Sequence, residues 1–488
     1  MRINYEEKID VLNKLISKIS INFLIILFVI IIIGMFFINS VYLYIDTAAF
    51  KINNIFNYLG IIINIFGFLI LVLLEKVLAL KFKKKKYINF IIFLIYFITE
   101  IIYIKLVPIK PFSDMFFITE IALSDFKNEI QYLQHYPNNL PISIIFNLIF
   151  RITQYDVIHI KIFNIICNMA TIYFAYKIYE NIYKKKNNIV ILLGICSIST
   201  FLYVNNAYND IIFTALTTII LYLVTKEKQS KIDIFIISIL VFLQFIVRPV
   251  GIILIIAVCM YYLLKNKNIK NIVILLSIFL ICNIMYSQLE KEIIPKSDEI
   301  QQYPIWSFIQ MGINEKEFGF QDGSHSTEWT FGDVKNRIQE LGPQRLLKLL
   351  CKKQYWLWTE GTYQVERYAF GTGAPEQFSY TTTVTNMIYD VDNSKARKAL
   401  EYLMKGQYFV LIVLSLIDLI IKDKDETIKN KKDILLYTII GFFCFYTIWE
   451  IKSRYIYCLY PIFLILSTQG IEKIINLLKK KGEQNGKI

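Results

Sequence analysis

The sequence predicts an all-α polytopic membrane protein with about twelve transmembrane helices. Of the 488 residues, 56% are hydrophobic and only 19% are charged, whereas soluble domains carry about 25% charged residues. Apolar runs long enough to cross a bilayer, about 20 residues each, recur along the chain. Short lysine clusters separate these runs. A soluble enzyme, a disordered chain and a nucleic-acid binder are therefore excluded.

Each expected span is an apolar run that a helix rising about 1.5 Å per residue would carry across the hydrocarbon core. The first run follows a charged N-terminal segment and is too long for a cleaved signal sequence, so we expect an uncleaved first span. The expected spans are residues 20–45, 58–80, 88–106, 157–181, 188–204, 210–225, 231–247, 249–265, 270–287, 406–421, 433–449 and 454–472.

Lysine clusters set the expected orientation, because positive residues accumulate on the cytoplasmic side. With the clusters and the N-terminus in the cytoplasm, the spans alternate correctly only if residues 141–152 do not cross. We expect this short apolar segment to be an interfacial helix on the outer face. The formal net charge of +14 is then an orientation signal and says nothing about a binding partner.

This topology predicts three parts. An N-terminal transmembrane module, residues 1–287, contains an external loop at 107–156. Residues 288–405 form an extracytoplasmic insert of mixed helix and loop, which holds four of the five tryptophans. Residues 406–488 form the last transmembrane helices and a cytoplasmic tail.

Polar and charged residues gather at the outward-facing ends of the spans. A charge deep in a membrane helix costs about 2.5–3.5 kcal/mol, so such residues need a reason to be there. The residues at these junctions are Asp114, Asp210, Arg248, Glu450 and Arg454. Each carboxylate also has a structural interpretation. Asp114, or equally Ser113, would cap a helix over 115–125, and Asp210 would cap the sixth span.

Arginine is rare in this chain, with eight residues against 45 lysines. Seven of the eight lie outside in the predicted topology. Arg248 and Arg454 fall at the level of lipid phosphates, and arginine is the better bidentate partner for phosphate. The alternative is that each neutralises a nearby carboxylate or reaches lipid headgroups.

The order and common sidedness of these elements resemble the GT-C glycosyltransferases. The chain is similar to bacterial polytopic enzymes such as protein O-mannosyltransferases and lipid A aminoarabinose transferases. The elements are, in order, Asp114, Tyr-Pro-Asn-Asn at 136–139, the expected interfacial helix, Tyr-Asn-Asp at 208–210, Arg-Pro at 248–249, and Glu450 with Arg454 and Tyr455.

The resemblance implies a sugar donor linked to polyprenyl phosphate, used on the outer face. It implies that Asp114 is the catalytic carboxylate and that the insert covers the site. Chemically, Asp114 would accept the proton of the attacking hydroxyl, and Arg248 and Arg454 would stabilise the charge on the leaving phosphate. Many relatives carry paired acidic residues in the first loop, but Ser113 precedes Asp114 here. We therefore predict no required metal or other cofactor.

Further polar and aromatic residues are candidates for positioning and covering the substrates. Tyr136, Asn138, Asn139, Asp210 and Glu450 would position donor or acceptor. Trp356, Trp358, Glu360 and Tyr363 would form a carbohydrate-facing lid, or alternatively pack inside the insert.

Two other functions remain open from the sequence. A polysaccharide transporter or flippase would suit twelve spans, but it should line a midplane cavity with polar groups. An envelope polysaccharide polymerase or ligase would share the external arginines. The richness in Ile, Lys and Asn suggests an AT-rich bacterial genome, and hence a plasma-membrane enzyme acting on an envelope glycan, glycolipid or protein.

Overall fold

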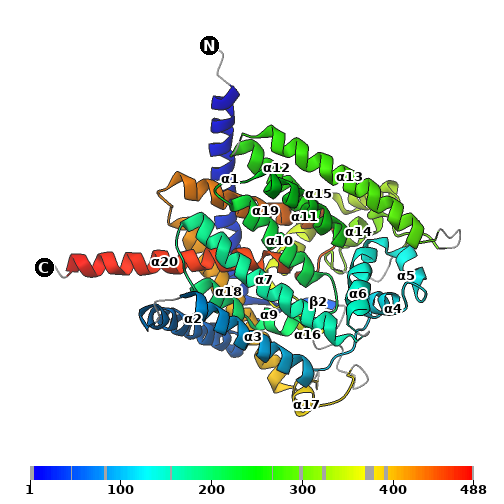
Figure 1. Cartoon of the computed structure of the whole chain (residues 1–488), viewed down its shortest axis with the longest axis horizontal. Coiled ribbons are helices and arrows are strands. Elements are labelled where there is room, and N and C mark those ends of the chain that lie inside the picture. The colour runs from blue at the N-terminus through cyan, green and yellow to red at the C-terminus, as the bar shows by residue number, and fades with distance from the viewer. Residues whose placement is uncertain are drawn as a thin grey trace.

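The computed structural model describes residues 5–44, 47–81, 85–153, 156–265, 267–295, 300–320, 326–368, 378–389 and 394–485. Helices dominate this part of the chain (Figure 1). The first half contains α1 (Tyr5–Phe37), β1 (Ile38–Tyr44), β2 (Thr47–Ile52), α2 (Ile55–Lys81), α3 (Lys85–Leu106), α4 (Asp114–Leu123), α5 (Ile130–His135), η1 (Pro137–Asn139), α6 (Leu140–Ile152), α7 (Ile158–Tyr183), α8 (Ile189–Ile195), α9 (Ile198–Tyr203) and α10 (Asp210–Thr225).

The second half continues the bundle and contains the helices of the insert. Its elements are α11 (Lys231–Val247), η2 (Pro249–Gly251), α12 (Ile252–Leu264), α13 (Ile269–Ile293), α14 (Ile305–Gly312), α15 (Phe331–Thr359), α16 (Val365–Tyr368), α17 (Thr383–Tyr389), α18 (Lys395–Ile420), α19 (Glu426–Ile448), η4 (Ser453–Leu459) and α20 (Tyr460–Asn485).

The helices support the predicted class of polytopic membrane protein. Within the described residues, seven helices are long and apolar enough to cross a membrane: Glu7–Phe37, Ile55–Val77, Tyr87–Leu106, Ile158–Tyr183, Ile269–Ile293, Lys395–Ile420 and Ser453–Lys480. Two shorter apolar helices, Asp210–Thr225 and Pro249–Leu264, also fall on expected spans. The predicted number of twelve spans is not confirmed.

One expected span, residues 188–204, is two helices instead of one. The helix is interrupted between α8 and α9, where the Ser197 side chain accepts a hydrogen bond from the backbone N–H of Thr200 at 3.3 Å. Gln407 of α18 serves both sides of the break. Its amide donates to the Cys196 carbonyl at 2.9 Å and accepts from the Ile198 N–H at 3.0 Å. A broken helix is tolerated inside a bundle because a neighbour satisfies its backbone groups.

A β hairpin between α1 and α2 departs from the all-α prediction. The helix expected over 20–45 ends at Phe37, and β1 pairs antiparallel with β2, joining Ile38 to Ile52 and Val41 to Ala49. The segment after Phe37, Ile-Asn-Ser-Val-Tyr-Leu-Tyr, contains the β-branched and aromatic residues that favour a strand. The apolar residues of this strand explain why the sequence alone extends the first expected span to residue 45.

The predicted boundaries of the insert fall inside helices. Residue 287 lies within α13, which continues to Ile293, and residue 405 lies within α18, which begins at Lys395. The first turns of α18 are rich in charged residues. The start of a span predicted from hydrophobicity alone therefore falls later than the start of the helix. In the insert, α15 consists of two helical segments joined at Gly342. This glycine has a φ of 65° and is followed by Pro343.

The connection between α3 and α7 meets the insert at one side of the molecule, where α4, α5 and α6 lie beside the start of α14 (Figure 1). Hydrogen bonds are among the contacts that join them. The backbone N–H of Tyr303 donates to the His135 carbonyl at 3.3 Å, and the Gln134 amide donates to the Pro295 carbonyl at 2.8 Å. The helix expected at 141–152 is present as α6.

A buried ionic cluster ties α18, α19 and α20 together. Lys473 lies 2.6 Å from Asp418 and 2.9 Å from Asp423, and Lys432 pairs with the same two carboxylates. Lys473 stands about 20 Å along α20 from its start at Tyr460, given the helical rise. This cluster therefore holds the bundle far from the outward junctions that the sequence singled out.

Glycines allow the helices to approach closely, as in many membrane bundles. A Cβ atom added to Gly406 of α18 would stand 2.4 Å from the backbone of Gly60 in α2. A Cβ atom at Gly470 of α20 would stand 2.0 Å from the Leu414 carbonyl oxygen. By contrast, a Cβ atom at Gly67 of α2 would meet nothing within 4 Å.

We expect Gly406→Ala to destabilise the protein despite the better helix propensity of alanine. Overpacking in a close contact costs about 1–3 kcal/mol, and here the obstructing atoms belong to the backbone. The matched control is Gly67→Ala, which should be neutral or slightly stabilising. Thermal unfolding in detergent measures both, and equal melting temperatures for the two variants would contradict the predicted contact.

Candidate functional site

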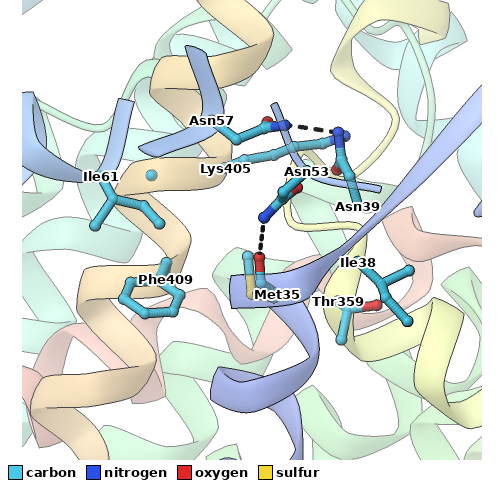
Figure 2. Close-up of a pocket in the computed structure, with 10 residues that line it drawn as sticks. Met35, Ile38, Asn39, Asn53, Asn57, Ile61, Thr359, Lys405 and Phe409 are labelled. Carbon is cyan, nitrogen blue, oxygen red and sulfur yellow. Dashed lines mark hydrogen bonds between the residues drawn. The ribbon is translucent and has the colours of Figure 1, made fainter. Parts of the chain in front are cut away.

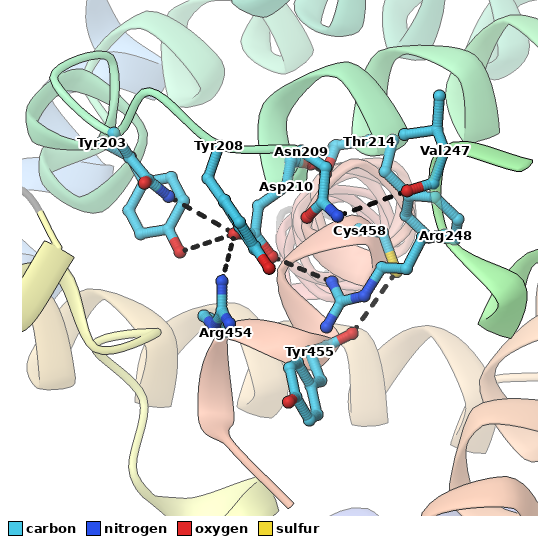
Figure 3. A network of polar contacts seen from close by, with 12 residues as sticks. Tyr203, Tyr208, Asn209, Asp210, Thr214, Val247, Arg248, Arg454, Tyr455 and Cys458 are labelled. Carbon is cyan, nitrogen blue, oxygen red and sulfur yellow. Dashed lines mark hydrogen bonds and ion pairs between the residues drawn. The ribbon is translucent and has the colours of Figure 1, made fainter. Parts of the chain in front are cut away.

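The carboxylate of Asp210 is the centre of a buried polar network (Figure 3). Asp210 is the first residue of α10, and two arginines from distant parts of the chain donate hydrogen bonds to its carboxylate. Arg248, between α11 and η2, places Nη1 2.9 Å from Oδ1. Arg454 in η4 places Nη1 3.1 Å from Oδ2. Three of the outward junctions expected from the sequence thus meet at one carboxylate.

Two neutral donors complete the surroundings of Asp210. The Tyr203 hydroxyl lies 3.4 Å and the Asn206 amide 3.3 Å from Oδ2. Asn209, not Asp210, holds the N-cap position of α10, and its side chain makes no capping bond. The capping interpretation of Asp210 is therefore wrong, because its carboxylate is committed to side chains.

The alternative interpretation was that each arginine neutralises a nearby carboxylate. The structure agrees with it in part, because both arginines pair with Asp210. A single carboxylate serves both guanidinium groups. Both guanidiniums lie against aromatic rings. Arg248 is 4.3 Å from the centroid of Tyr455, and Arg454 is 4.6 Å from that of Tyr208. Such rings hold a cation without neutralising it.

Glu450 lies at the edge of the same cluster. Its carboxylate accepts a hydrogen bond from the Tyr455 hydroxyl at 2.5 Å. Arg248 lies over the ring of the same tyrosine. Lys452 stands 3.9 Å from Glu450 and 5.9 Å from the Tyr455 ring. Sequence reasoning did not select Lys452, although it lies between two residues that were selected.

Asp114 reaches the network through three tyrosines. Burial raises the pKa of the Tyr132, Tyr136 and Tyr208 phenols, and the negative charge of Asp114 raises all three further. Glu450 acts in the same way on Tyr136. Asp114 is only half-buried and opens α4, while Ser113 holds the N-cap position without a side-chain cap. The N-cap interpretation of Asp114 is therefore wrong.

The Tyr-Pro-Asn-Asn element contributes unequally. Asn139 is buried, and its amide donates to the Tyr132 hydroxyl at 2.7 Å and accepts from the Tyr208 hydroxyl at 3.4 Å. It therefore links the loop that carries Asp114 to the tyrosine that lies against Arg454. Asn138 is exposed. The sequence analysis did not select Tyr132, although its ring centroid lies 5.2 Å from that of Tyr136.

The residues proposed as a lid are all buried in this structure. Trp356 packs on Phe320, the Trp358 indole donates to Gln354 at 2.9 Å, and Tyr363 packs between Tyr408 and Tyr457. Glu360 accepts a hydrogen bond from the Thr362 N–H at 3.0 Å. Their burial agrees with the packing alternative, because a lid would need an aromatic face open to the sugar.

Lys353 of α15 fastens the insert to the segment that carries Glu450 and Arg454. Its buried ammonium donates to three backbone carbonyls, those of Gly312 at 2.7 Å, Thr447 at 3.2 Å and Trp449 at 2.7 Å. The last two are at the C-terminal end of α19, where helix carbonyls lack partners. The Glu450 N–H also donates to the Phe308 carbonyl at 3.2 Å.

A polar pocket lies away from this network, where α1, the β1–β2 hairpin, α2 and α18 meet (Figure 2). Its lining includes Asn39, Asn57 and Lys405. The Lys405 ammonium already donates to Asn39 Oδ1 at 2.7 Å, the Ser40 carbonyl at 2.9 Å and Glu401 at 2.7 Å. This pocket therefore reads as a buried structural contact, because its cation is fully engaged within the protein.

Among the described residues, no group of three or more His, Cys, Asp or Glu side chains is placed to hold a metal ion. Asp114 and Asp210 contact different partners: Asp114 acts on Tyr132, and Asp210 pairs with the two arginines. Metal independence of the reaction stays a prediction.

Comparison with known proteins gives one match. The sequence model of the Alg9-like mannosyltransferase family matches residues 102–290, less than half of the chain. No curated protein and no solved structure matches. The matched segment contains Asp114, the Tyr-Pro-Asn-Asn element, Asp210 and Arg248. This similarity supports a membrane glycosyltransferase of the GT-C type.

We expect Lys353→Met to loosen the insert from the bundle. The substitution leaves three buried carbonyls without their donor, and each unsatisfied group costs about 1–3 kcal/mol. The matched control is Lys352→Met, which removes the same charge from the neighbouring exposed position. Limited proteolysis of the insert and thermal unfolding would measure the effect, and the same cleavage rate in both variants would contradict it.

Proposed function

We propose that this chain transfers a sugar from a polyprenyl-phosphate donor to an acceptor on the extracytoplasmic face of a bacterial plasma membrane. The observation that carries the proposal is the pair of arginines sharing one carboxylate. Two neighbouring guanidiniums match the oxygens of a phosphate in geometry and charge, and a sugar phosphodiester carries a single negative charge. The match to the Alg9-like family supports the transfer of a sugar.

In this proposal Arg248 and Arg454 bind the donor phosphate. The bond between the sugar anomeric carbon and the phosphate oxygen breaks with its electron pair on the phosphate. Fixed donors aimed at that developing charge stabilise the transition state more than the ground state. The two guanidiniums are held by Asp210 and by the rings of Tyr455 and Tyr208, so they would not need to reorganise during the reaction.

Asp114 is the proposed general base. It would accept the proton of the acceptor hydroxyl as that oxygen attacks the anomeric carbon. Support comes from its partial exposure, which leaves room for an acceptor, and from its link to Arg454 through Tyr132, Asn139 and Tyr208. Tyr136, Asn138 and Glu450 are proposed to position the substrates around it. The reaction as proposed needs no metal or cofactor.

The acceptor is proposed to be an envelope glycan, a glycolipid or a protein hydroxyl. A polymerase or ligase would use the same site with a longer lipid-linked glycan. The transporter alternative has less support, because the polar residues of α7 serve the bundle. Asn164 donates to the Val204 and Asn206 carbonyls at 3.1 and 2.9 Å, and Asn168 donates to the Thr200 carbonyl at 3.0 Å.

We expect Asp114→Asn to lower transfer by about 10²–10⁴-fold, the usual contribution of a positioned base. Purified protein would be given a sugar-bearing polyprenyl phosphate and an envelope extract, and release of the lipid phosphate would be measured. The matched control is Glu120→Gln on the same helix, which should retain activity. Full turnover by Asp114→Asn would remove Asp114 from the mechanism.

We expect Arg454→Lys to lower transfer by about 10²-fold or more, the cost of losing one preorganised donor to a developing oxyanion. Lysine keeps the charge but loses the planar fork that serves Asp210 and phosphate together. Arg151→Lys is the matched control, because Arg151 pairs with Asp125 at the surface of the first loop. Wild-type turnover by Arg454→Lys would exclude Arg454 from the phosphate site.

A further inference from the structure

The ion pair between Glu450 and Lys452 is open in this structure. Lys452 Nζ lies 3.9 Å from Glu450 Oε2, whereas a hydrogen bond between such groups spans about 2.7–3.2 Å. We propose that the two side chains bind one hydroxyl group of the donor sugar, which accepts a hydrogen bond from Lys452 and donates one to Glu450. The inference rests on the proposed function, and it assigns a sugar-binding role to Lys452.

Both side chains are largely buried and still have hydrogen-bonding capacity. The side chain of Lys452 is 13% exposed and that of Glu450 is 7% exposed. Oε1 of Glu450 accepts from the Tyr455 hydroxyl at 2.5 Å. Within the part of the chain that the structure describes, Oε2 and the Lys452 ammonium make no hydrogen bond. Buried polar groups normally have partners, so the pair suits a ligand that both donates and accepts.

A sugar hydroxyl fits this gap better than a phosphate oxygen does. A hydroxyl carries one donor hydrogen and two acceptor lone pairs, so it serves the ammonium and the carboxylate together. An oxygen of a phosphodiester only accepts, and its negative charge would be repelled by Glu450. Polar groups that are too far apart for a direct hydrogen bond can be bridged by one oxygen between them.

The pair lies beside the proposed phosphate site. The Lys452 ammonium and the Arg248 guanidinium lie over the same aromatic ring, at 5.9 and 4.3 Å from the centroid of Tyr455. The hydroxyl of that tyrosine binds Glu450. In the donor, the sugar is bonded directly to the phosphate. A phosphate on the arginines would therefore bring the sugar hydroxyls close to Glu450 and Lys452.

The pair also lies on the side of the proposed base. Burial raises the pKa of the Tyr136 phenol, and the charges of Asp114 and Glu450 raise it further, so both carboxylates act on one residue. The backbone around Glu450 is fixed by the insert. The Glu450 N–H donates to the Phe308 carbonyl at 3.2 Å, and the next N–H donates to the Gly319 carbonyl at 2.8 Å. Groups held in place before binding lose less conformational entropy when the ligand arrives.

The test compares two diesters of equal charge, so that the contribution of the phosphate is the same in both. Mannosyl farnesyl phosphate carries a test pyranose, and methyl farnesyl phosphate carries no sugar. Binding of both would be measured on the full chain in detergent. In the wild type, we expect the mannosyl probe to bind at least about tenfold more tightly. In Lys452→Met and in Glu450→Gln, we expect this preference to fall about tenfold, as for the loss of a hydrogen bond to a charged group. Affinity for the methyl probe should not change.

Further measurements separate sugar binding from a structural role. The double variant should lose no more of the preference than either single variant, because both groups bind the same hydroxyl. Among mannosyl probes that each lack one hydroxyl, we expect one to bind the wild type about tenfold more weakly than the intact probe, and Lys452→Met should bind these two probes alike. Lys105→Met, at an exposed lysine near the end of α3, is the control and should keep the wild-type preference.

Equal weakening of both diesters in Lys452→Met would overturn the proposal and would indicate that Lys452 binds phosphate. An unchanged preference in both single variants, or a wild type that binds the two diesters alike, would overturn it as well. If the variants do not fold, the wild type decides the question, because equal binding of the intact and all the deoxy probes would contradict a bridging hydroxyl. Failure of the wild type to bind either diester would instead overturn the proposed phosphate site.

Discussion

One carboxylate shared by two arginines is the interaction on which the candidate site depends. Asp210 joins α9, α10, the end of α11 and η4, and its partner Arg454 is 244 positions away in the sequence. Burying three charges is costly unless each is well partnered. The network meets that cost with hydrogen bonds to Asp210 and with the rings of Tyr455 and Tyr208. The same two guanidiniums are the groups that the proposed phosphate site uses.

The second constraint is that the arginine-bearing segment is irregular. The chain between α19 and η4 is not helical at Glu450 and Ile451, so the backbone groups there need partners elsewhere. The insert supplies them through Lys353, Phe308 and Gly319, whose carbonyl accepts from the Ile451 N–H at 2.8 Å. The insert therefore acts first as a support for Arg454 and Glu450, and the buried Trp-Leu-Trp segment is part of that support.

Much of the site could be selected from the sequence because charges are rare and costly in such an apolar chain. Asp114, Asp210, Arg248, Glu450 and Arg454 stood out at helix ends, and the structure gathers them around one cluster. Tyr132, Tyr208 and Lys452 did not stand out as site residues. Tyrosine is common here and carries no charge, and one more lysine among 45 gives no signal without its contacts.

The sequence by itself determined the class of protein and the kind of residues at the site. Hydrophobic runs fix membrane helices because apolar length and bilayer thickness must agree, and that pattern is local. Only the tertiary structure decided that Asp210 binds both arginines, that α8 and α9 are separate, that β1 and β2 form a hairpin, and that the tryptophans of the insert are buried. These outcomes depend on contacts between distant segments, such as Gln407 with the broken helix, and no local pattern specifies which partner a buried polar group will find.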